Sequence, residues 1–229
     1  MEKEKIIIAL DVSTIKELER LLDILSPHIR IFKVGMELFY SCGPKVIDVI
    51  KKYDKEIFLD LKFHDIPNTV KNSARVATRL GVFMFNVHAS GGSEMMKAAV
   101  EGAEEESEKL GIDRPRILGV TVLTSIADAT EAQVLSLAKS AKASSLDGVV
   151  ASPQETAKIR KESGQDFLIV TPGIRPEGSE KQDQKRTATP KQAFSSGADY
   201  IVIGRPITKA KDPAKALQDI VRSYEQGSG

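Results

Sequence analysis

Short apolar runs rich in β-branched residues recur along the whole chain, and longer segments with helical spacing separate them. We expect eight strands, at residues 6–10, 29–34, 57–61, 82–87, 117–123, 148–151, 167–171 and 200–203. Leucine and isoleucine recur at helical intervals between them, as in residues 15–25, which predicts amphipathic helices. Strand alternating with helix implies parallel strands joined by right-handed crossovers.

Eight strand–helix units predict a closed (β/α)8 barrel, the TIM barrel of α/β proteins. The 229 residues suit one such barrel and no shift in composition marks a boundary, so we expect a single domain over residues 1–229. The strands are continuous apolar runs, as expected when both of their faces are buried. An open, doubly wound sheet is the alternative, but no glycine-rich dinucleotide fingerprint follows the first strand.

Composition excludes several classes of partner. Lysine and arginine number 33 against 32 aspartates and glutamates, which gives a net charge of +1 and predicts no nucleic-acid partner. The apolar run near the N-terminus is too short for a signal peptide or a membrane span, so we expect no membrane partner. Cys42 is the only cysteine, which fits a reducing cytoplasm because no disulfide can form within the chain.

A cluster of charge accompanies the third predicted strand. Strand alternation places Asp60 and Lys62 on the same face, and Asp65 follows beyond the strand end. Burying such a cluster is costly, because desolvation offsets most of the Coulomb attraction. The cluster is therefore our first candidate for chemistry, with a purely structural ion-pair network as the alternative.

The carboxyl ends of the other predicted strands also carry polar residues, and in a barrel these ends form one rim where active sites lie. They are Asp11, Lys33, Asn86, His88, Thr121, Thr124, Ser152, Thr171, Gly204 and Arg205. Simpler interpretations stay open for five of them. Asp11 could be a helix N-cap, Lys33 could extend to solvent, Thr124 could cap a turn and Arg205 could be a surface arginine, while His88 is more typical of a structural histidine.

Two features favour a phosphate site on this rim. Gly204 allows close approach of the backbone to an anion, and Arg205 offers a bidentate fork. In barrels, phosphate often binds after the seventh and eighth strands. The irregular, polar segment 172–190 follows the seventh predicted strand, and long loops of this kind are functional or disordered.

Seven segments taken together resemble the orotidine 5′-monophosphate decarboxylase family, in its monofunctional, bacterial form. They are DLKFHDIPNT (60–69), FNVHASGG (85–92), GVTVLTS (119–125), DGVVASPQE (147–155), TPGIRP (171–176), DQKR (183–186) and GADYIVIGRPIT (197–208). The matches occur in order and cover most of the chain. The resemblance implies a cofactor-free enzyme that converts orotidine 5′-monophosphate to uridine 5′-monophosphate (UMP) and CO2, the last step of de novo pyrimidine synthesis.

The resemblance also implies roles for individual residues. Lys62 would protonate the C6 carbanion, with Asp60 beside the substrate carboxylate and with Lys33 and Asp65 completing an array of alternating charge. Asp11 and Lys33 would contact the ribose and Thr124 the pyrimidine ring. The phosphate-side contacts would be Arg175, Gln184, Gly204 and Arg205, with Gln184 in a mobile loop at about 173–189.

The resemblance further implies a homodimer, in which Asp65 and Thr69 reach into the neighbouring subunit's site.

Two alternative functions stay open: that of the sugar-phosphate branch of the same superfamily, which uses Mg²⁺, and that of a nucleotide-binding barrel without activity. The continuation Ile66-Pro67-Asn68-Thr69 favours the orotidine branch. Two segments depart from the family pattern: 143–146 lacks the glycine expected before the sixth strand, and 126–129 is an unusual helix start.

Overall fold

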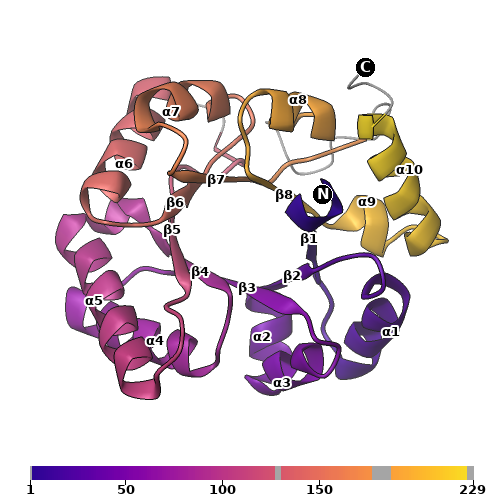
Figure 1. Ribbon diagram of the computed structural model, residues 1–229, viewed down its shortest axis with the longest axis horizontal. Helices are drawn as coiled ribbons and strands as arrows, with labels where there is room; N and C mark the ends of the chain where they lie inside the picture. Colours follow the sequence, from indigo (N-terminus) through magenta and orange to yellow (C-terminus); the bar gives the residue numbers. More distant parts are fainter. Residues whose placement is uncertain (1, 127–129, 177–186, 226–229) are drawn as a thin grey trace.

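The computed structural model describes residues 2–126, 130–176 and 187–225. Eight parallel strands follow one another around a closed barrel, and the last pairs with the first (Figure 1). The strands are β1 (Ile6–Ala9), β2 (Ile31–Gly35), β3 (Glu56–Phe63), β4 (Met84–His88), β5 (Arg116–Val120), β6 (Gly148–Val150), β7 (Leu168–Thr171) and β8 (Tyr200–Ile203). The predicted (β/α)8 barrel is confirmed, and the open sheet is wrong.

The α-helices form a ring outside the strands (Figure 1). They are α1 (Ile15–Leu25), α2 (Met36–Cys42), α3 (Lys45–Lys51), α4 (Pro67–Arg79), α5 (Ser93–Leu110), α6 (Glu131–Ala143), α7 (Thr156–Ser163), α8 (Pro190–Ser195), α9 (Arg205–Thr208) and α10 (Pro213–Glu225). Two short 3₁₀ helices cover Glu2–Lys5 and Ala89–Gly91. Within the described ranges, no helix combines the length and the apolar character needed to cross a bilayer.

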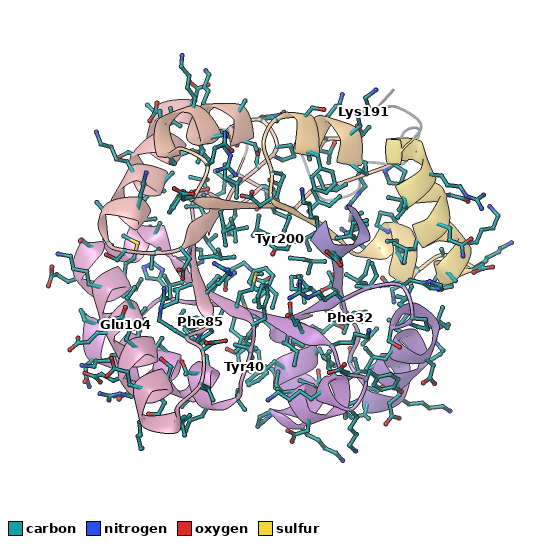
Figure 2. All side chains as sticks on the ribbon, viewed as in Figure 1. Phe32, Tyr40, Phe85, Glu104, Lys191 and Tyr200 are labelled. Carbon is teal, nitrogen blue, oxygen red and sulfur yellow. The ribbon has the colours of Figure 1, made fainter. Side chains whose placement is uncertain are left out.

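The barrel has two apolar cores. The larger core lies between the strands and the helices and contains Phe32 and Phe85, whereas Tyr200 packs against the smaller core (Figure 2). The smaller core is built from alternate strand residues: Ile7, Ala9, Ile31, Phe58, Met84, Leu118, Val170 and Val202. Side chains two residues apart share a face of a strand, so each strand that contributes here continues toward its carboxyl end on the same face.

That continuation carries the chain from apolar to polar side chains. On β1 the inner face runs from Ile7 and Ala9 to Asp11, and on β3 it runs from Phe58 to Asp60. The same two-residue step leads to Lys33 on β2 and to Asn86 on β4. The smaller core therefore ends in a polar layer at the carboxyl rim, where the candidate site lies.

The third strand is longer and less regular than predicted. It continues to Phe63, and its pairing with β4 shifts by two residues, because Leu59 pairs with Phe85 but Phe63 pairs with Val87. Lys62 lies within this bulge, at φ 52°, in the left-handed region. Bulges redirect side chains near active sites, and strand propensity alone does not predict one. The fifth strand is shorter than predicted and ends at Val120.

The N-cap of α1 and the segment 143–146 differ in how they agree with the sequence-based expectations. The N-cap of α1 is Thr14, whose hydroxyl accepts from Glu17 N at 3.2 Å, so the N-cap alternative for Asp11 is wrong. In the segment 143–146, Ser145 has φ 63°, a conformation that favours glycine, where the expected glycine is missing. Residues 127–129, part of the other unusual segment, lie outside the described residues.

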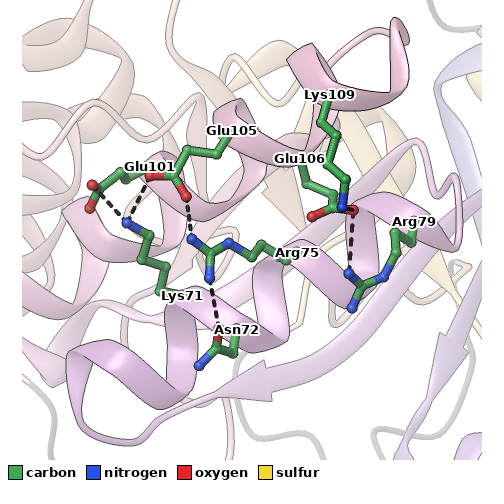
Figure 3. A network of polar contacts seen from close by, with 8 residues as sticks. All are labelled: Lys71, Asn72, Arg75, Arg79, Glu101, Glu105, Glu106 and Lys109. Atoms are coloured by element: carbon green, nitrogen blue, oxygen red, sulfur yellow. Dashed lines mark hydrogen bonds and ion pairs between the residues drawn. The ribbon is translucent and has the colours of Figure 1, made fainter.

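Close packing of α4 against α5 supports the β3 and β4 side of the barrel. The helices approach so closely at Gly102 that a Cβ there would lie 2.3 Å from Lys71 O. Lys71 Nζ pairs with Glu101 at 2.7 Å and with Glu105 at 2.9 Å, and Arg75 pairs with the same Glu105 (Figure 3). This contact fixes the first turns of α4, which contain Thr69 and directly follow Asp65, relative to the rim.

Candidate active site

Four charged side chains on the first three strands and their ends form a continuous array of alternating sign. Lys33 Nζ lies 3.4 Å from Asp11 Oδ1 and 3.2 Å from Asp60 Oδ2. The other oxygen of Asp60, Oδ1, accepts from Lys62 Nζ at 2.6 Å. The predicted proximity of Asp60 and Lys62 is therefore confirmed, and Lys33 turns inward to the array instead of extending to solvent.

A fourth strand contributes an amide to the same array. Asn86, on β4, donates from Nδ2 to Asp60 Oδ1 at 2.7 Å and accepts from the backbone N–H of Lys62 at 2.8 Å. Its side chain is buried, with 1% of the residue exposed. The sequence places Asn86 at a strand end but gives it no role, because an asparagine there is equally typical of a turn or a cap.

The array fixes the charge of its central carboxylate. Burial alone raises the pKa of Asp60, but Lys33, Lys62 and the hydrogen bonds from Lys62 and Asn86 outweigh burial and hold that pKa below its usual value. Burial likewise lowers the pKa of Lys33, but Asp60 and Asp11 outweigh it and the pKa of Lys33 is raised. Both groups are therefore charged at neutral pH, as a buried pair of this geometry requires.

The array forms one side of a cavity at the carboxyl rim. The cavity is lined by Asp11, Lys33, Asp60, Lys62, Thr124, Ser152, Arg175, Gly204 and Arg205, together with apolar residues such as Phe58, Val120 and Val202. The structure thus brings eight of the predicted site residues together. Ser152, a buried residue after β6, also lines the cavity; its position at a strand end was visible in the sequence, but no role was assigned to it there.

The predicted phosphate end of the cavity is built after β7 and β8. Arg175 is buried and lines the cavity, and its backbone N–H donates to Ala188 O at 2.9 Å, which ties together the two ends of the irregular segment. Gly204 lies close to Asp11, because the strands that precede them, β8 and β1, are neighbours. A Cβ at Gly204 would approach Asp11 Oδ2 to 3.2 Å, so glycine leaves space beside this carboxylate. Gln184 lies outside the described residues.

Asp65 and Thr69 lie apart from this cavity in the single chain. Asp65 is exposed, and its Oδ1 accepts from Ile66 N at 2.7 Å at the turn that leads into α4. Within the described ranges, Asp65 forms no ion pair with Lys62, and neither Asp65 nor Thr69 is among the residues that line the cavity. One chain therefore contains the Asp60–Lys62 pair but not the second carboxylate that the sequence pattern places beside it.

His88 ends β4 next to the array and is half-buried. Its ring lies 5.2 Å, between centroids, from the ring of His64. Burial lowers the pKa of His88, and the nearby His64 and Lys62 lower it further despite the opposing effect of Asp60. His88 is therefore neutral near pH 7, and its structural role stays a prediction.

The order of these groups around the barrel can be compared with known proteins. The family model described as "Orotidine 5′-phosphate decarboxylase / HUMPS family" matches residues 4–220. The chain belongs to this family. The matched range includes every strand of the barrel and every described residue that lines the cavity.

Individual members of the orotidine 5′-phosphate decarboxylase / HUMPS family are similar over nearly their full length. The orotidine 5′-phosphate decarboxylase of Geotalea daltonii is 49% identical, with 98% of each chain covered. That of Lactococcus lactis subsp. cremoris is 44% identical, with 99% of this chain and all of the relative covered. The crystal structure of orotidine 5′-phosphate decarboxylase from Lactobacillus acidophilus superimposes with a TM-score of 0.84 at 44% identity, covering 96% of this chain and 99% of that one.

Proposed function

We propose that this protein decarboxylates orotidine 5′-monophosphate to UMP and CO2, the last step of de novo UMP synthesis. The observation that carries the proposal is the Asp60–Lys62 pair, held in an array of alternating charge in a cavity that Arg175 and Arg205 also line. Relatives 44% to 49% identical are named for this activity. A cavity lined by a lysine and by two arginines suits a substrate that has a reacting ring and a phosphate.

The reaction needs an electrostatic stabiliser and a proton donor at the same place. When the bond from C6 to the carboxylate breaks, its electron pair stays on C6 in an orbital that the ring cannot delocalise. An ammonium close to C6 stabilises the developing charge and then transfers a proton to C6 as CO2 leaves. We assign both tasks to Lys62, which recovers its proton from solvent after the product departs. This chemistry requires no cofactor.

Asp60 and Lys33 prepare Lys62 for this role. Asp60 holds the Lys62 ammonium at 2.6 Å and is itself held by Lys33 at 3.2 Å, so the donor is positioned before the substrate arrives. A preorganised charge of this kind needs little rearrangement during the reaction, which is the main source of electrostatic catalysis. In the proposed complex Asp60 also faces the substrate carboxylate, whose departure as neutral CO2 relieves the repulsion between the two groups.

The remaining contacts would bind the parts of the substrate that do not react. Asp11 and Lys33 would bind the ribose hydroxyls, Thr124 the pyrimidine ring, and Arg175, Gly204 and Arg205 the phosphate. Binding energy from a remote group can be used to orient the reacting centre. Gln184 and the mobile phosphate-side loop expected at about 173–189 stay predictions, because most of that segment lies outside the described residues.

We also propose a homodimer in which Asp65 and Thr69 complete the partner's site. Two exposed large apolar side chains support the proposal: Ile66, which directly follows Asp65, is 67% exposed, and Tyr40 on α2 is 76% exposed. Apolar side chains that form an exposed patch mark a surface that another chain covers. A partner's Asp65 would then place a second carboxylate beside Lys62. A cytoplasmic location fits the single cysteine.

A spectrophotometric assay tests the proposed function directly. The purified chain should consume orotidine 5′-monophosphate with loss of its ultraviolet absorbance, and UMP and CO2 should appear in equal amounts. A parallel reaction with excess chelator should run at the same rate, since Lys62 replaces any metal in the proposed chemistry. Absence of turnover with tight UMP binding would instead favour the nucleotide-binding barrel, and activity on sugar phosphates that chelator abolishes would favour the Mg²⁺-dependent branch.

A further inference from the structure

We propose that Asn86 is a positioning residue for this reaction, because its amide holds the bulge of β3 in the shape that directs Asp60 and Lys62 into one cavity. The proposal rests on the proposed function for its kinetic consequences. Its structural basis is independent of that function, since it depends only on two hydrogen bonds and one unusual backbone conformation.

The first hydrogen bond secures the backbone of Lys62. A left-handed conformation costs a residue with a side chain about 1–2 kcal/mol, so the φ of 52° at Lys62 must be held by its surroundings. Pairing of β3 with β4 jumps from Leu59–Phe85 to Phe63–Val87. Asn86 is the single β4 residue within this jump, and its Oδ1 accepts the Lys62 N–H at 2.8 Å. The side chain of Asn86 thus takes the place of a ladder carbonyl inside the bulge.

The second hydrogen bond secures the carboxylate that orients the Lys62 ammonium. Asn86 Nδ2 donates at 2.7 Å to Asp60 Oδ1, the same oxygen that accepts from Lys62 Nζ at 2.6 Å. The contacts form a closed circuit that runs from the Lys62 N–H through the Asn86 amide and Asp60 to the Lys62 ammonium. One amide therefore holds both ends of the lysine, its backbone directly and its ammonium through Asp60.

Burial makes this amide difficult to replace. Asn86 is 1% exposed, so water cannot easily take over either of its bonds, and a buried N–H left without an acceptor is costly. Without the amide, Lys62 would lose the acceptor that compensates its backbone strain. Asp60 would also lose one of the donors that fix its orientation. A displacement of about 1 Å at a reacting group can lower a rate about 100-fold.

Two substitutions separate the two bonds. Asn86→Leu removes both and keeps the number of side-chain heavy atoms, whereas Asn86→Asp keeps an acceptor for the Lys62 N–H but replaces the donor to Asp60 by an oxygen. Asn72→Leu, on the side of α4 that carries Arg75, is a matched control, because it makes the same change away from the cavity. For each variant we would measure kcat and KM for orotidine 5′-monophosphate, the affinity for UMP, and hydrogen–deuterium exchange at the Lys62 amide.

We expect kcat to fall about 100-fold in Asn86→Leu and Asn86→Asp while KM and the UMP affinity change less than about threefold, because the phosphate contacts are intact. The Lys62 amide should exchange much faster in Asn86→Leu but stay protected in Asn86→Asp, and amides at the start of β3 should stay protected in both. A residue needed only for packing would not produce this divergence between the two variants.

Unchanged exchange at the Lys62 amide in Asn86→Leu would overturn the proposal, as would a kcat within about threefold of the unmodified chain in either variant. If Asn86→Leu does not fold, the kcat of Asn86→Asp alone decides whether the proposed positioning role of Asn86 holds. The exchange measurement involves no turnover. A failure of the proposed function, seen as absence of turnover by the unmodified chain, is thus distinguished from a failure of this inference.

Discussion

Lys33 Nζ lies 3.2 Å from Asp60 Oδ2, although the residue that pairs with Asp60 across the two strands is Gly35. The missing side chain at Gly35 explains the contact. A Cβ there would lie 3.0 Å from Lys33 Nζ, so glycine provides the space in which the Lys33 ammonium turns along its own strand toward the carboxylate. The central ion pair of the array therefore depends on a residue that carries no functional group.

Replacing Gly35 should disturb the array without disturbing the fold. The residue has φ −91° and ψ 179°, an extended conformation that alanine adopts readily, so Gly35→Ala tests only the space that the Cβ occupies. We expect kcat/KM to fall about tenfold as Lys33 shifts, with the melting temperature nearly unchanged. Steady-state kinetics and a thermal melt check this expectation, and an unaltered kcat/KM would mean that Lys33 has room to adjust.

The charge of Asp60 predicts how stability depends on pH. Its pKa is lower in the folded chain than the ordinary value of 3.8, so the ionised carboxylate stabilises the fold above that value and this contribution is lost as pH falls through the folded pKa. The pKa of Lys33 is raised above 10.5, so its contribution is complete below that value and is lost as pH rises through the folded pKa.

Urea unfolding of the unmodified chain and of Asp60→Asn at a series of pH values tests the acidic side of this prediction. The difference in unfolding free energy between the two should be constant from neutral pH down to about pH 4 and should then decrease, because the unfolded carboxyl group takes up a proton first. A difference that stays constant to pH 3 would show that Asp60 titrates alike in both states.

Removing the Arg205 side chain should weaken catalysis only for substrates that carry a phosphate. For Arg205→Ala we expect kcat/KM with orotidine 5′-monophosphate to fall by about three orders of magnitude, since the proposed charge-assisted contact to the phosphate is lost together with the orientation that it provides. With the nucleoside orotidine, which lacks the phosphate, the variant and the unmodified chain should react at similar rates. An equal loss with both substrates would place Arg205 at the reacting end of the cavity.

Mixed dimers should reveal whether a site is shared between chains. Lys62→Ala and Asp65→Ala should each be almost inactive alone, because one lacks the proton donor and the other the partner's carboxylate. Mixing equal amounts and allowing the subunits to exchange should restore about a quarter of the original activity, since half of the dimers are then mixed and each has one intact site. Activity that stays at the sum of the two variants would mean that Asp65 serves its own chain.

Ser145→Gly should stabilise the protein. Ser145 occupies the left-handed region at φ 63°, which costs a serine about 1 kcal/mol and glycine much less. Part of this gain is offset by the greater freedom of glycine in the unfolded chain, so we expect a net gain of about 0.5 kcal/mol in urea unfolding. Ser145→Ala is the control, because it removes the hydroxyl and keeps the Cβ. A similar gain in both variants would point to the hydroxyl rather than to the backbone.

The barrel could be predicted because its signal is repeated eight times, and small errors at single strands do not alter the alternation of strand and helix. Strand ends were less predictable for a physical reason. Val122 and Leu123 extend an apolar run, so the sequence favours a longer β5, but both line the cavity after the strand has ended. The bulge at Lys62 has no sequence signal at all, since lysine has no preference for the left-handed region.

Some residues of the candidate site could likewise be predicted from the sequence, and others could not. Asp11, Lys33, Asp60 and Lys62 were predictable because the two-residue period of a strand and the common rim of a barrel bring them together. Asn86 was not assigned a role, since its importance comes from a register shift that appears only in three dimensions. The role of Asp65 in a partner's site could be assigned only by resemblance, because the second chain that would complete its environment is not encoded in any local pattern.

The smaller core and the polar layer above it occupy different positions of the same strands, and this separation has an evolutionary consequence. Substitutions in the polar layer leave the apolar layer that closes the barrel untouched, so new chemistry can be explored with little risk to folding. Among proteins that descend from one such barrel, the apolar layer that closes the barrel can stay the same while the rim residues change. Descendants of one ancestral barrel could thus acquire distinct substrates by exchanging a few rim side chains.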